Sequence, residues 1–258
     1  MHNAAFAALG LNWRYLAFEV DPKNLRAAIA GAQAMNFAGL NLTVPHKLLA
    51  VDMVDALDES AAKWGAVNTI RFGPGGATGF NTDADAIVTS LREDLQVELT
   101  GAKVLLLGAG GAGRTAALKL ASAKVAELFL VNRTQSKAEE IAGEIERQFP
   151  DVKVATAYPP GGVDLILNAT SLGLKSGDLS PLDENEFSLK QAAAVYDMIY
   201  RPAETKLLAA AKAAGCKTAN GLGMLLHQGA KAFEIWTGQA APLAEMRRAL
   251  EQNVYGNK

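Results

Sequence analysis

The stretch Val104-Leu105-Leu106-Leu107-Gly108-Ala109-Gly110-Gly111-Ala112-Gly113 determines the architecture of this chain. Four consecutive apolar residues are typical of a β-strand that is buried on both faces of a parallel sheet. The glycines that follow form the pattern Gly-x-Gly-x-x-Gly, and an alanine-rich helical segment comes next. A strand, a glycine-rich turn and a helix in this order form a dinucleotide-binding unit, in which the helix N-terminus faces a pyrophosphate. A purely structural glycine turn is the alternative, and the strand–turn–helix context disfavours it.

Apolar runs that predict strands continue on the C-terminal side of this stretch. Besides 104–107, we expect strands at 128–131, 152–155, 165–167, 192–196 and 217–219. Helices are expected between several of them, at 136–148 and at about 203–214. Strands that alternate with helical crossovers indicate a doubly wound parallel sheet of the Rossmann type.

The segment before about residue 88 alternates short helices and strands. Strands are expected at 13–20, where side chains alternate with a period of two, and at 39–43 and 66–70. Asp21 and Pro22 predict the start of a helix, because Asp caps helices and Pro suits the first turn. Another helix is expected at 83–94, and two more without strands at 221–255.

These elements predict an α/β protein with two domains. Residues 1–88 form an N-terminal α/β substrate domain, and residues 89–220 form a Rossmann-type dinucleotide-binding domain. The C-terminal helices of 221–258 are expected to pack back on the first domain. Ligand sites often form in the cleft between two such domains.

The composition is that of an ordinary soluble enzyme. Of 258 residues, 50% are hydrophobic and 20% charged, and the net charge of −2 gives no sign of a nucleic-acid or membrane partner. The single cysteine, Cys216, cannot form an internal disulfide, which fits a reducing compartment. No uncharged apolar run is long enough for a membrane span, and no Lys or Arg precedes the apolar segment 4–11, so we expect a cytoplasmic protein.

The residues after the strand at 128–131 indicate which dinucleotide binds. NAD sites usually place Asp or Glu there to hold the ribose hydroxyls. This chain has Asn132, Arg133 and Thr134, with Lys137 nearby. Because Arg pairs bidentately with a phosphate that a carboxylate would repel, the segment predicts NADP. A solvated Arg in a strand–helix turn is the alternative.

Polar residues gather at the ends of the short N-terminal strands, in the segments 41–47, 65–69 and 81–83. Lys47 and Asp83 could form a proton-handling pair, since a carbonyl group that gains a hydride also needs a proton. A solvated lysine and a helix-capping aspartate are the alternatives. The three histidines share no ligand spacing with a Cys or a carboxylate, so no metal site is expected.

Eight segments resemble, in order, those of the shikimate dehydrogenase family. They are NLTVPHK (41–47), GAVNT (65–69), GFNTD (79–83), GAGGAG (108–113), VNRT (131–134), LNATSLG (167–173), YDMIYRPAETKLL (196–208) and GLGMLLHQGAKAFEIWTG (221–238). The resemblance implies reversible NADP-dependent reduction of 3-dehydroshikimate to shikimate in aromatic amino-acid biosynthesis, by a monomer or homodimer. A quinate/shikimate dehydrogenase of broader specificity, or a nucleotide-binding relative with impaired turnover, is the alternative.

The resemblance also implies roles for single residues. Lys47 would be the catalytic lysine and Asp83 its partner. The substrate would contact Thr43, Asn68 and Gln228 through its hydroxyls and lie near Tyr200 with its carboxylate. The cofactor would contact the glycine-rich turn and the segment after the next strand, and other residues would line its nicotinamide side. The turn supplies Gly108, Gly110, Gly111 and Gly113, the segment supplies Asn132, Arg133, Thr134 and Lys137, and the nicotinamide side has Thr170, Gly221 and Met224.

Two departures from the family pattern stand out. The family normally has a strand and a Ser-x-Ser motif, whose serines bind the substrate carboxylate, just before the block matched here by residues 1–6; the chain as written does not contain them. The family also usually has Gly-x-Gly after Asn-Thr-Asp, where this chain has Ala84-Asp85-Ala86. The second departure can change the shape of the site and therefore the preferred substrate.

We expect the chain as written to bind NADPH but to turn over shikimate poorly. An added N-terminal extension with Ser-x-Ser should lower the apparent Michaelis constant by about 100-fold or more, because two hydrogen bonds to a charged group are each worth about 1.5–3 kcal/mol. Cofactor affinity should change little. Steady-state kinetics and NADPH titration of both forms test this, and full activity of the chain as written at micromolar shikimate would contradict it.

Overall fold

The computed structural model describes residues 1–256, which form two compact units. The first unit comprises Met1–Ala84 and the chain from Leu226 onward, and the second unit comprises Asp85–Leu225. Gly221 and Met224 therefore belong to the same unit as the glycine-rich turn, whereas Gln228 belongs to the other.

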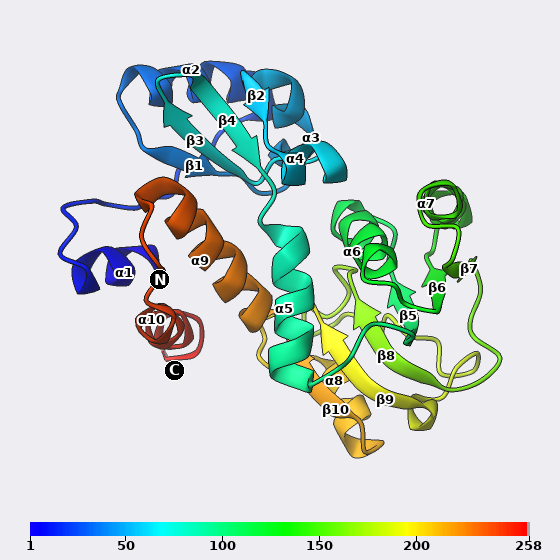
Figure 1. Cartoon of the computed structure of the whole chain (residues 1–258). Helices are drawn as coiled ribbons and strands as arrows, with labels where there is room; N and C mark the ends of the chain where they lie inside the picture. Colours follow the sequence, from blue (N-terminus) through cyan, green and yellow to red (C-terminus); the bar gives the residue numbers. More distant parts are fainter. Residues whose placement is uncertain (257–258) are drawn as a thin grey trace. The chain divides into compact units, whose positions relative to one another are not determined.

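The second unit is built on a parallel sheet of six strands (Figure 1). Its strands are β5 (Lys103–Leu107), β6 (Glu127–Val131), β7 (Lys153–Ala155), β8 (Val163–Asn168), β9 (Ala192–Asp197) and β10 (Lys217–Asn220). Their order is β10-β9-β8-β5-β6-β7, and every neighbouring pair is parallel. The order reverses beside β5, which is the point where doubly wound sheets bind ligands. The predicted fold class and its six strands are confirmed.

Helices cover both faces of this sheet, which explains the continuous apolar run in β5. α6 (Gly111–Ser122) and α7 (Gln135–Gln148) pack on β5, β6 and β7, while α8 (Lys206–Ala213) packs on β9 and β10. Leu105, Leu107 and Val195 join the core cluster under α8. Because successive side chains of a strand point to opposite faces, Leu106 and Tyr196 face the other side, and both are fully buried. α5 (Asp83–Leu95) precedes β5 in the chain.

The first unit contains a smaller mixed sheet. Its strands are β1 (Gly39–Asn41), β2 (Ala56–Leu57), β3 (Thr69–Gly73) and β4 (Gly76–Phe80), in the order β1-β3-β4-β2. β3 and β4 form a hairpin through a tight turn at 73–76, where Gly76 has a φ of +94°. The remaining elements are the 3-10 helices Pro22–Asn24 and Ala50–Met53, α2 (Leu25–Ala34), α3 (His46–Leu49) and α4 (Glu59–Trp64). Leu25 and Ile29 of α2 form a core with Val67 and Ile70.

The strand that we predict at 13–20 is wrong. This segment belongs to no helix or strand, and Leu16 and Phe18 are 66% and 63% exposed. Period-two alternation favours an extended backbone, but a strand also needs a partner for its N–H and C=O groups. Among the described residues β1 pairs only with β3, and no strand pairs with 13–20. The strand predicted at 66–70 begins at Thr69, and the residues before it line the site described below.

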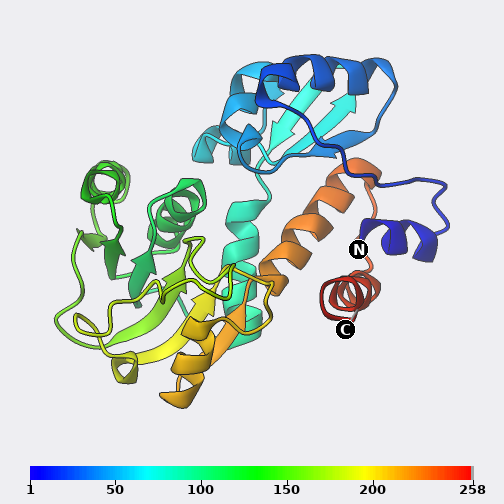
Figure 2. The same cartoon turned by 180° about the vertical axis from the view of Figure 1, so that it is seen from behind.

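The C-terminal helices return to the first unit, as predicted. α1 (His2–Ala8) packs against α10 (Leu243–Tyr255), and Figure 2 shows the two helices side by side. α9 (Leu222–Thr237) carries Trp236, whose Nε1 donates a hydrogen bond of 2.9 Å to the carbonyl of Ile70 in β3. The His2 ring stacks on Tyr15 with 4.4 Å between ring centroids and also contacts Trp236. These rings join the N-terminal segment, helix α9 and the small sheet.

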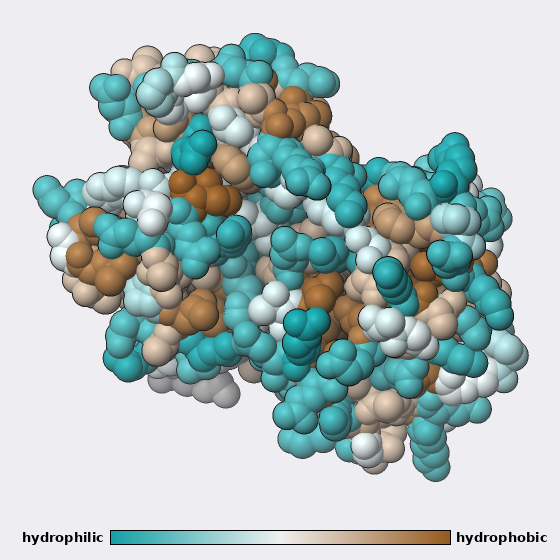
Figure 3. All heavy atoms as spheres, in the orientation of Figure 1, coloured by the Kyte–Doolittle hydropathy of each residue, from teal (hydrophilic) through white to brown (hydrophobic). Residues whose placement is uncertain are grey.

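Within residues 1–256, no helix is both long and apolar enough to cross a membrane. On the face drawn in Figure 3, hydrophilic side chains predominate and apolar ones form small separate groups.

Burial of His2 predicts a pH dependence of stability. His2 is 4% exposed, and burial, with the nearby N-terminal charge, lowers the pKa of its imidazole from 6.5 to about 4. The folded protein therefore keeps this ring neutral, whereas the unfolded chain takes up a proton below pH 6.5. The free energy of unfolding should decrease as the pH falls from about 6.5 to about 4, by on the order of 2–3 kcal/mol from this group.

Chemical denaturation of the parent and of His2→Phe across this pH range measures the effect. Phe preserves the stacking but does not titrate, so the difference in unfolding free energy between the two proteins should grow as the pH falls. A difference that stays constant with pH would show that His2 does not contribute in this way.

Candidate functional site

The two residues of the predicted proton-handling pair, Lys47 and Asp83, lie in contact in the first unit. Lys47 lies in α3, which follows β1, and Asp83 is the first residue of α5, which follows β4. The Lys47 Nζ atom is 2.8 Å from Asp83 Oδ2, and the two side chains are 29% and 12% exposed. The backbone of Lys47 is held as well, because its carbonyl accepts a hydrogen bond of 2.9 Å from Val67 N. A lysine side chain that is paired and mostly buried differs from a solvated surface charge.

Asn81, rather than Asp83, caps helix α5. The Asn81 Oδ1 atom accepts hydrogen bonds from the backbone N–H groups of Asp83 and Ala84, at 3.1 and 3.2 Å. Its Nδ2 donates to the carbonyl of Ala66 at 3.1 Å. The interpretation of Asp83 as an N-cap is therefore wrong, because the residue two positions earlier satisfies those amides. The Asp83 carboxylate is left to bind Lys47.

Asn68 links the two central strands of the small sheet beside this pair. It is 1% exposed; its Nδ2 donates to Thr82 Oγ1 at 2.9 Å, and its Oδ1 accepts from Thr82 N at 2.8 Å. These bonds fix the backbone just before Asp83. The predicted contact of Asn68 with substrate stays a prediction.

The structure also locates the other predicted substrate residues. Thr43 is exposed in the turn before α3, where its carbonyl accepts a hydrogen bond from His46 N. Gln228 is half-buried on the part of α9 that belongs to the first unit. Tyr200 lies in the second unit, in the segment after β9, and is 37% exposed. Thr43, Asn68 and Gln228 thus share a unit with Lys47, and Tyr200 shares one with the glycine-rich turn.

The glycine-rich turn has the close contacts that only glycine permits. Gly108 has a φ of +105°, and a Cβ there would lie 2.8 Å from Thr170 Cγ2. A Cβ on Gly113 would lie 2.1 Å from the Gly108 carbonyl oxygen. By contrast, Gly110 and Gly111 are exposed and border open space, at the N-terminus of α6. Free amides with room in front of them suit a phosphate group, so the turn fits a dinucleotide.

The end of β6 is joined to this turn by Asn132. Its Oδ1 accepts a hydrogen bond of 3.1 Å from Ala109 N, and its Nδ2 donates to the carbonyl of Thr134 at 2.8 Å. Arg133, Thr134 and Lys137 are exposed. In the part of the chain that the structure describes, no carboxylate forms an ion pair with Arg133. The segment can therefore offer donors and positive charge to a second phosphate.

A buried polar network at the ends of β8 and β9 was missed by the sequence analysis. Asn168 and Asp197 are the last residues of these strands, both fully buried, and Asn168 Nδ2 donates to Asp197 Oδ1 at 2.9 Å. Burial raises the pKa of the Asp197 carboxyl, against the opposing effect of hydrogen bonds from Thr205, Ile199 and Asn168. The available signal was a polar residue at the end of each buried apolar strand.

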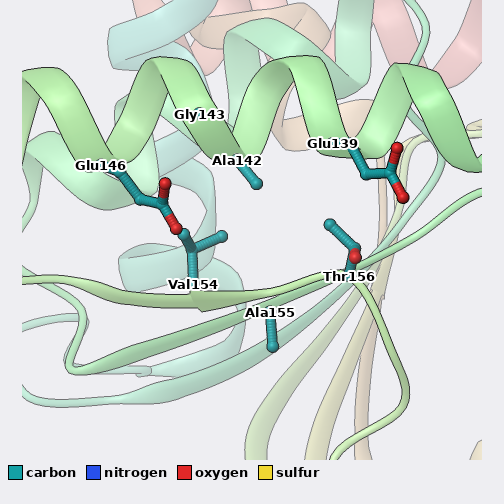
Figure 4. Close-up of a pocket in the computed structure, with 7 residues that line it drawn as sticks. All are labelled: Glu139, Ala142, Gly143, Glu146, Val154, Ala155 and Thr156. Atoms are coloured by element: carbon teal, nitrogen blue, oxygen red, sulfur yellow. The ribbon is translucent and has the colours of Figure 1, made fainter.

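A surface hollow between α7 and β7 contains none of the predicted substrate or cofactor residues. Figure 4 shows it lined by Glu139, Glu146 and Thr156, with Val154 and Ala155 below. Two carboxylates at its rim would repel phosphate, so it is not part of the candidate cofactor site. No cluster of His, Cys, Asp and Glu within residues 1–256 could hold a metal ion.

Comparison with known proteins gives the same family along most of the chain. Residues 1–70 match the shikimate dehydrogenase substrate binding domain, residues 90–171 the shikimate/quinate 5-dehydrogenase family, and residues 221–251 the shikimate 5'-dehydrogenase C-terminal domain. The shikimate dehydrogenase (NADP(+)) of Moorella thermoacetica is 44% identical over 260 residues, which cover 98% of this chain and 87% of that protein.

Two solved structures show the same fold. The 5-ketofructose reductase of a Gluconobacter strain superimposes with a TM-score of 0.86 at 37% identity and covers 98% of this chain and 92% of its own. Shikimate 5-dehydrogenase of Thermus thermophilus, solved with NADP(H) and shikimate, has a TM-score of 0.87 at 35% identity. The match covers 97% of this chain and 92% of that one. Three family models match this chain, and the relative of Moorella thermoacetica is 44% identical over 98% of it. The chain therefore belongs to the shikimate dehydrogenase family.

Proposed function

We propose that this protein catalyses the reversible NADP-dependent reduction of 3-dehydroshikimate to shikimate in aromatic amino-acid biosynthesis. The Lys47–Asp83 ion pair, at 2.8 Å, is the observation that carries this proposal. It supplies the proton-transferring group that the reduction of a carbonyl requires. The relative of Moorella thermoacetica, named as an NADP(+)-dependent shikimate dehydrogenase, supports the choice of substrate and cofactor.

The cofactor, when bound, supplies the hydride, and Lys47 handles the proton. The Lys47 ammonium group has three N–H donors, and Asp83 accepts from one of them. The others remain to donate to the carbonyl oxygen of the substrate, which becomes a hydroxyl group when the proton is transferred. In the oxidation direction the neutral amine accepts the proton from that hydroxyl. Asp83 keeps Nζ in one place through both directions.

We assign substrate binding to the first unit and cofactor binding to the second. Thr43, Asn68 and Gln228 of the first unit would contact substrate hydroxyls, with Tyr200 near the carboxylate. The glycine-rich turn and the segment Asn132–Thr134 with Lys137 would hold the phosphates, and Thr170, Gly221 and Met224 would line the nicotinamide side. The single cysteine supports action in the cytoplasm, where thiols stay reduced. We expect a monomer or homodimer.

A broader specificity for polyol acids is the second candidate, and the residues after Asp83 favour it. Ala84 and Ala86 are 0% and 3% exposed, so their methyl groups take space that glycine would leave open. Asp85 between them forms an ion pair with Lys119 at 2.5 Å, which fixes this turn of α5 on α6. NADP⁺ reduction assays with shikimate and with quinate distinguish the candidates, because a strict shikimate enzyme would use only shikimate.

Lys47→Ala should abolish most turnover and preserve NADPH binding, because the residue acts on the substrate. General acid–base groups contribute about 10²–10⁴ in rate. Initial rates with 3-dehydroshikimate and NADPH measure this loss, and fluorescence titration measures NADPH affinity. Lys23→Ala is the matched control, since Lys23 is an exposed lysine of the same unit. Turnover of Lys47→Ala within a few-fold of the parent would rule out Lys47 as the proton donor.

Arg133→Ala should weaken NADPH binding by about 10- to 100-fold, because a charge-assisted contact with the 2′-phosphate is worth about 1.5–3 kcal/mol. NADH affinity should stay the same, since NADH has no such phosphate. Titration of both cofactors against the parent, Arg133→Ala and the exposed control Arg147→Ala tests this. Equal affinity of the parent for NADPH and NADH would overturn the assignment.

A further inference from the structure

The first glycine of the cofactor turn, Gly108, packs against the side chain of Thr170. The Thr170 methyl group faces the bare Cα of Gly108, where a Cβ would come within 2.8 Å of it. Two hydrogen bonds to Asn168 Oδ1 hold Thr170 there, from its backbone N at 3.0 Å and from its Oγ1 at 2.8 Å. The position of Thr170 behind the turn therefore depends on the orientation of the Asn168 amide, because Thr170 is held only when the amide oxygen, and not the NH₂ group, faces it.

Asp197 determines the orientation of the Asn168 amide. Its carboxylate receives hydrogen bonds from Asn168 Nδ2 at 2.9 Å and Ile199 N at 3.0 Å on Oδ1, and from Thr205 Oγ1 at 2.6 Å on Oδ2. A carboxylate only accepts hydrogen bonds, so the NH₂ end of the Asn168 amide must face Asp197. The oxygen end then faces Thr170, whose N–H and O–H both require an acceptor.

The backbone around this network joins the three strand ends. Ala169 N donates to the carbonyl of Leu107 in β5, and Met198 N donates to the carbonyl of Asn168. The hydrogen bonds between the side chains of Asp197, Asn168 and Thr170 thus connect the end of β9, through the end of β8, to the turn that follows β5. All of these groups belong to the second unit.

We propose that Asp197 is a positioning residue of the cofactor site: by fixing the orientation of the Asn168 amide, it holds Thr170 against Gly108 and preorganises the glycine-rich turn for the dinucleotide. This inference rests on the proposed function, which assigns the turn to NADP. Asp197 itself is fully buried, so it acts through Asn168 and touches no ligand in this assignment.

Two substitutions of Asp197 separate geometry from charge. Asp197→Asn removes the charge but preserves an oxygen for Asn168 and Ile199, and its NH₂ group can donate to Thr205 Oγ1. Asp197→Ala leaves the Asn168 Nδ2 with only the carbonyl of Leu172, at 3.4 Å, as an acceptor, so the orientation of the amide is held much less firmly. We expect Asp197→Ala to raise the dissociation constant of NADPH by about tenfold or more, and Asp197→Asn to stay within about threefold of the parent.

Thr205→Val is the control for a merely structural role. Thr205 is 2% exposed, caps α8 and donates to the other oxygen of Asp197, so its loss should lower the melting temperature. The link from Asp197 to Asn168 remains in this variant, and NADPH affinity should stay within about twofold of the parent. Thermal unfolding and fluorescence titration with NADPH are measured on all variants, without substrate.

The outcomes distinguish the two proposals. If the parent does not bind NADPH, the proposed function fails, and this inference fails with it. If the parent binds but Asp197→Ala has unchanged affinity, or if Thr205→Val weakens binding equally, only the positioning role is overturned. Should Asp197→Ala not fold, Asn168→Ala decides, because Asn168 links Asp197 to Thr170 and is itself fully buried with no assigned ligand contact. A weaker NADPH affinity of Asn168→Ala supports the role, and an unchanged affinity overturns it.

Discussion

The close approach of α6 to the end of β5 is the constraint on which the second unit depends. A side chain at Gly113 would collide with the Gly108 carbonyl, and one at Gly108 would collide with Thr170. Without these two glycines the helix could not start directly above the strand, and its N-terminal amides would not point at open space. The remaining strands contribute to the site through the same edge: Asn132 from β6, Asn168 from β8 and Asp197 from β9 each bond to a neighbouring loop.

Most of the second unit could be predicted from the sequence because its central strands β5, β6, β8 and β9 are local apolar runs. A strand buried on both faces needs no knowledge of its neighbours to be found, as 104–107 illustrates. The first unit was harder, because its strands are short and half-exposed. Residues 13–20 show the limit most clearly. Alternation of side chains is a property of one segment, whereas a β-strand forms only when its backbone pairs with a second segment.

The candidate site shows a similar division. Lys47 and Asp83 were identified by residue type and resemblance, and the structure brings them into contact. The roles of Asn81 and Asn168 could not be assigned in advance, because an amide side chain becomes a cap or a link only through the backbone groups that surround it. Asp197 was hidden for a related reason: a carboxylate without a cationic partner is tolerated in a core only when several donors converge on it, and convergence is not visible in sequence.

The bond between Trp236 and Ile70 has a consequence for the order in which the chain folds. The second unit is continuous from Asp85 to Leu225, so all of its residues have been synthesised before α9 is complete. The first unit must wait, since the small sheet receives Trp236 from a position 166 residues further along the chain. On the ribosome the dinucleotide-binding half can therefore assemble first, while the half that begins the chain closes last.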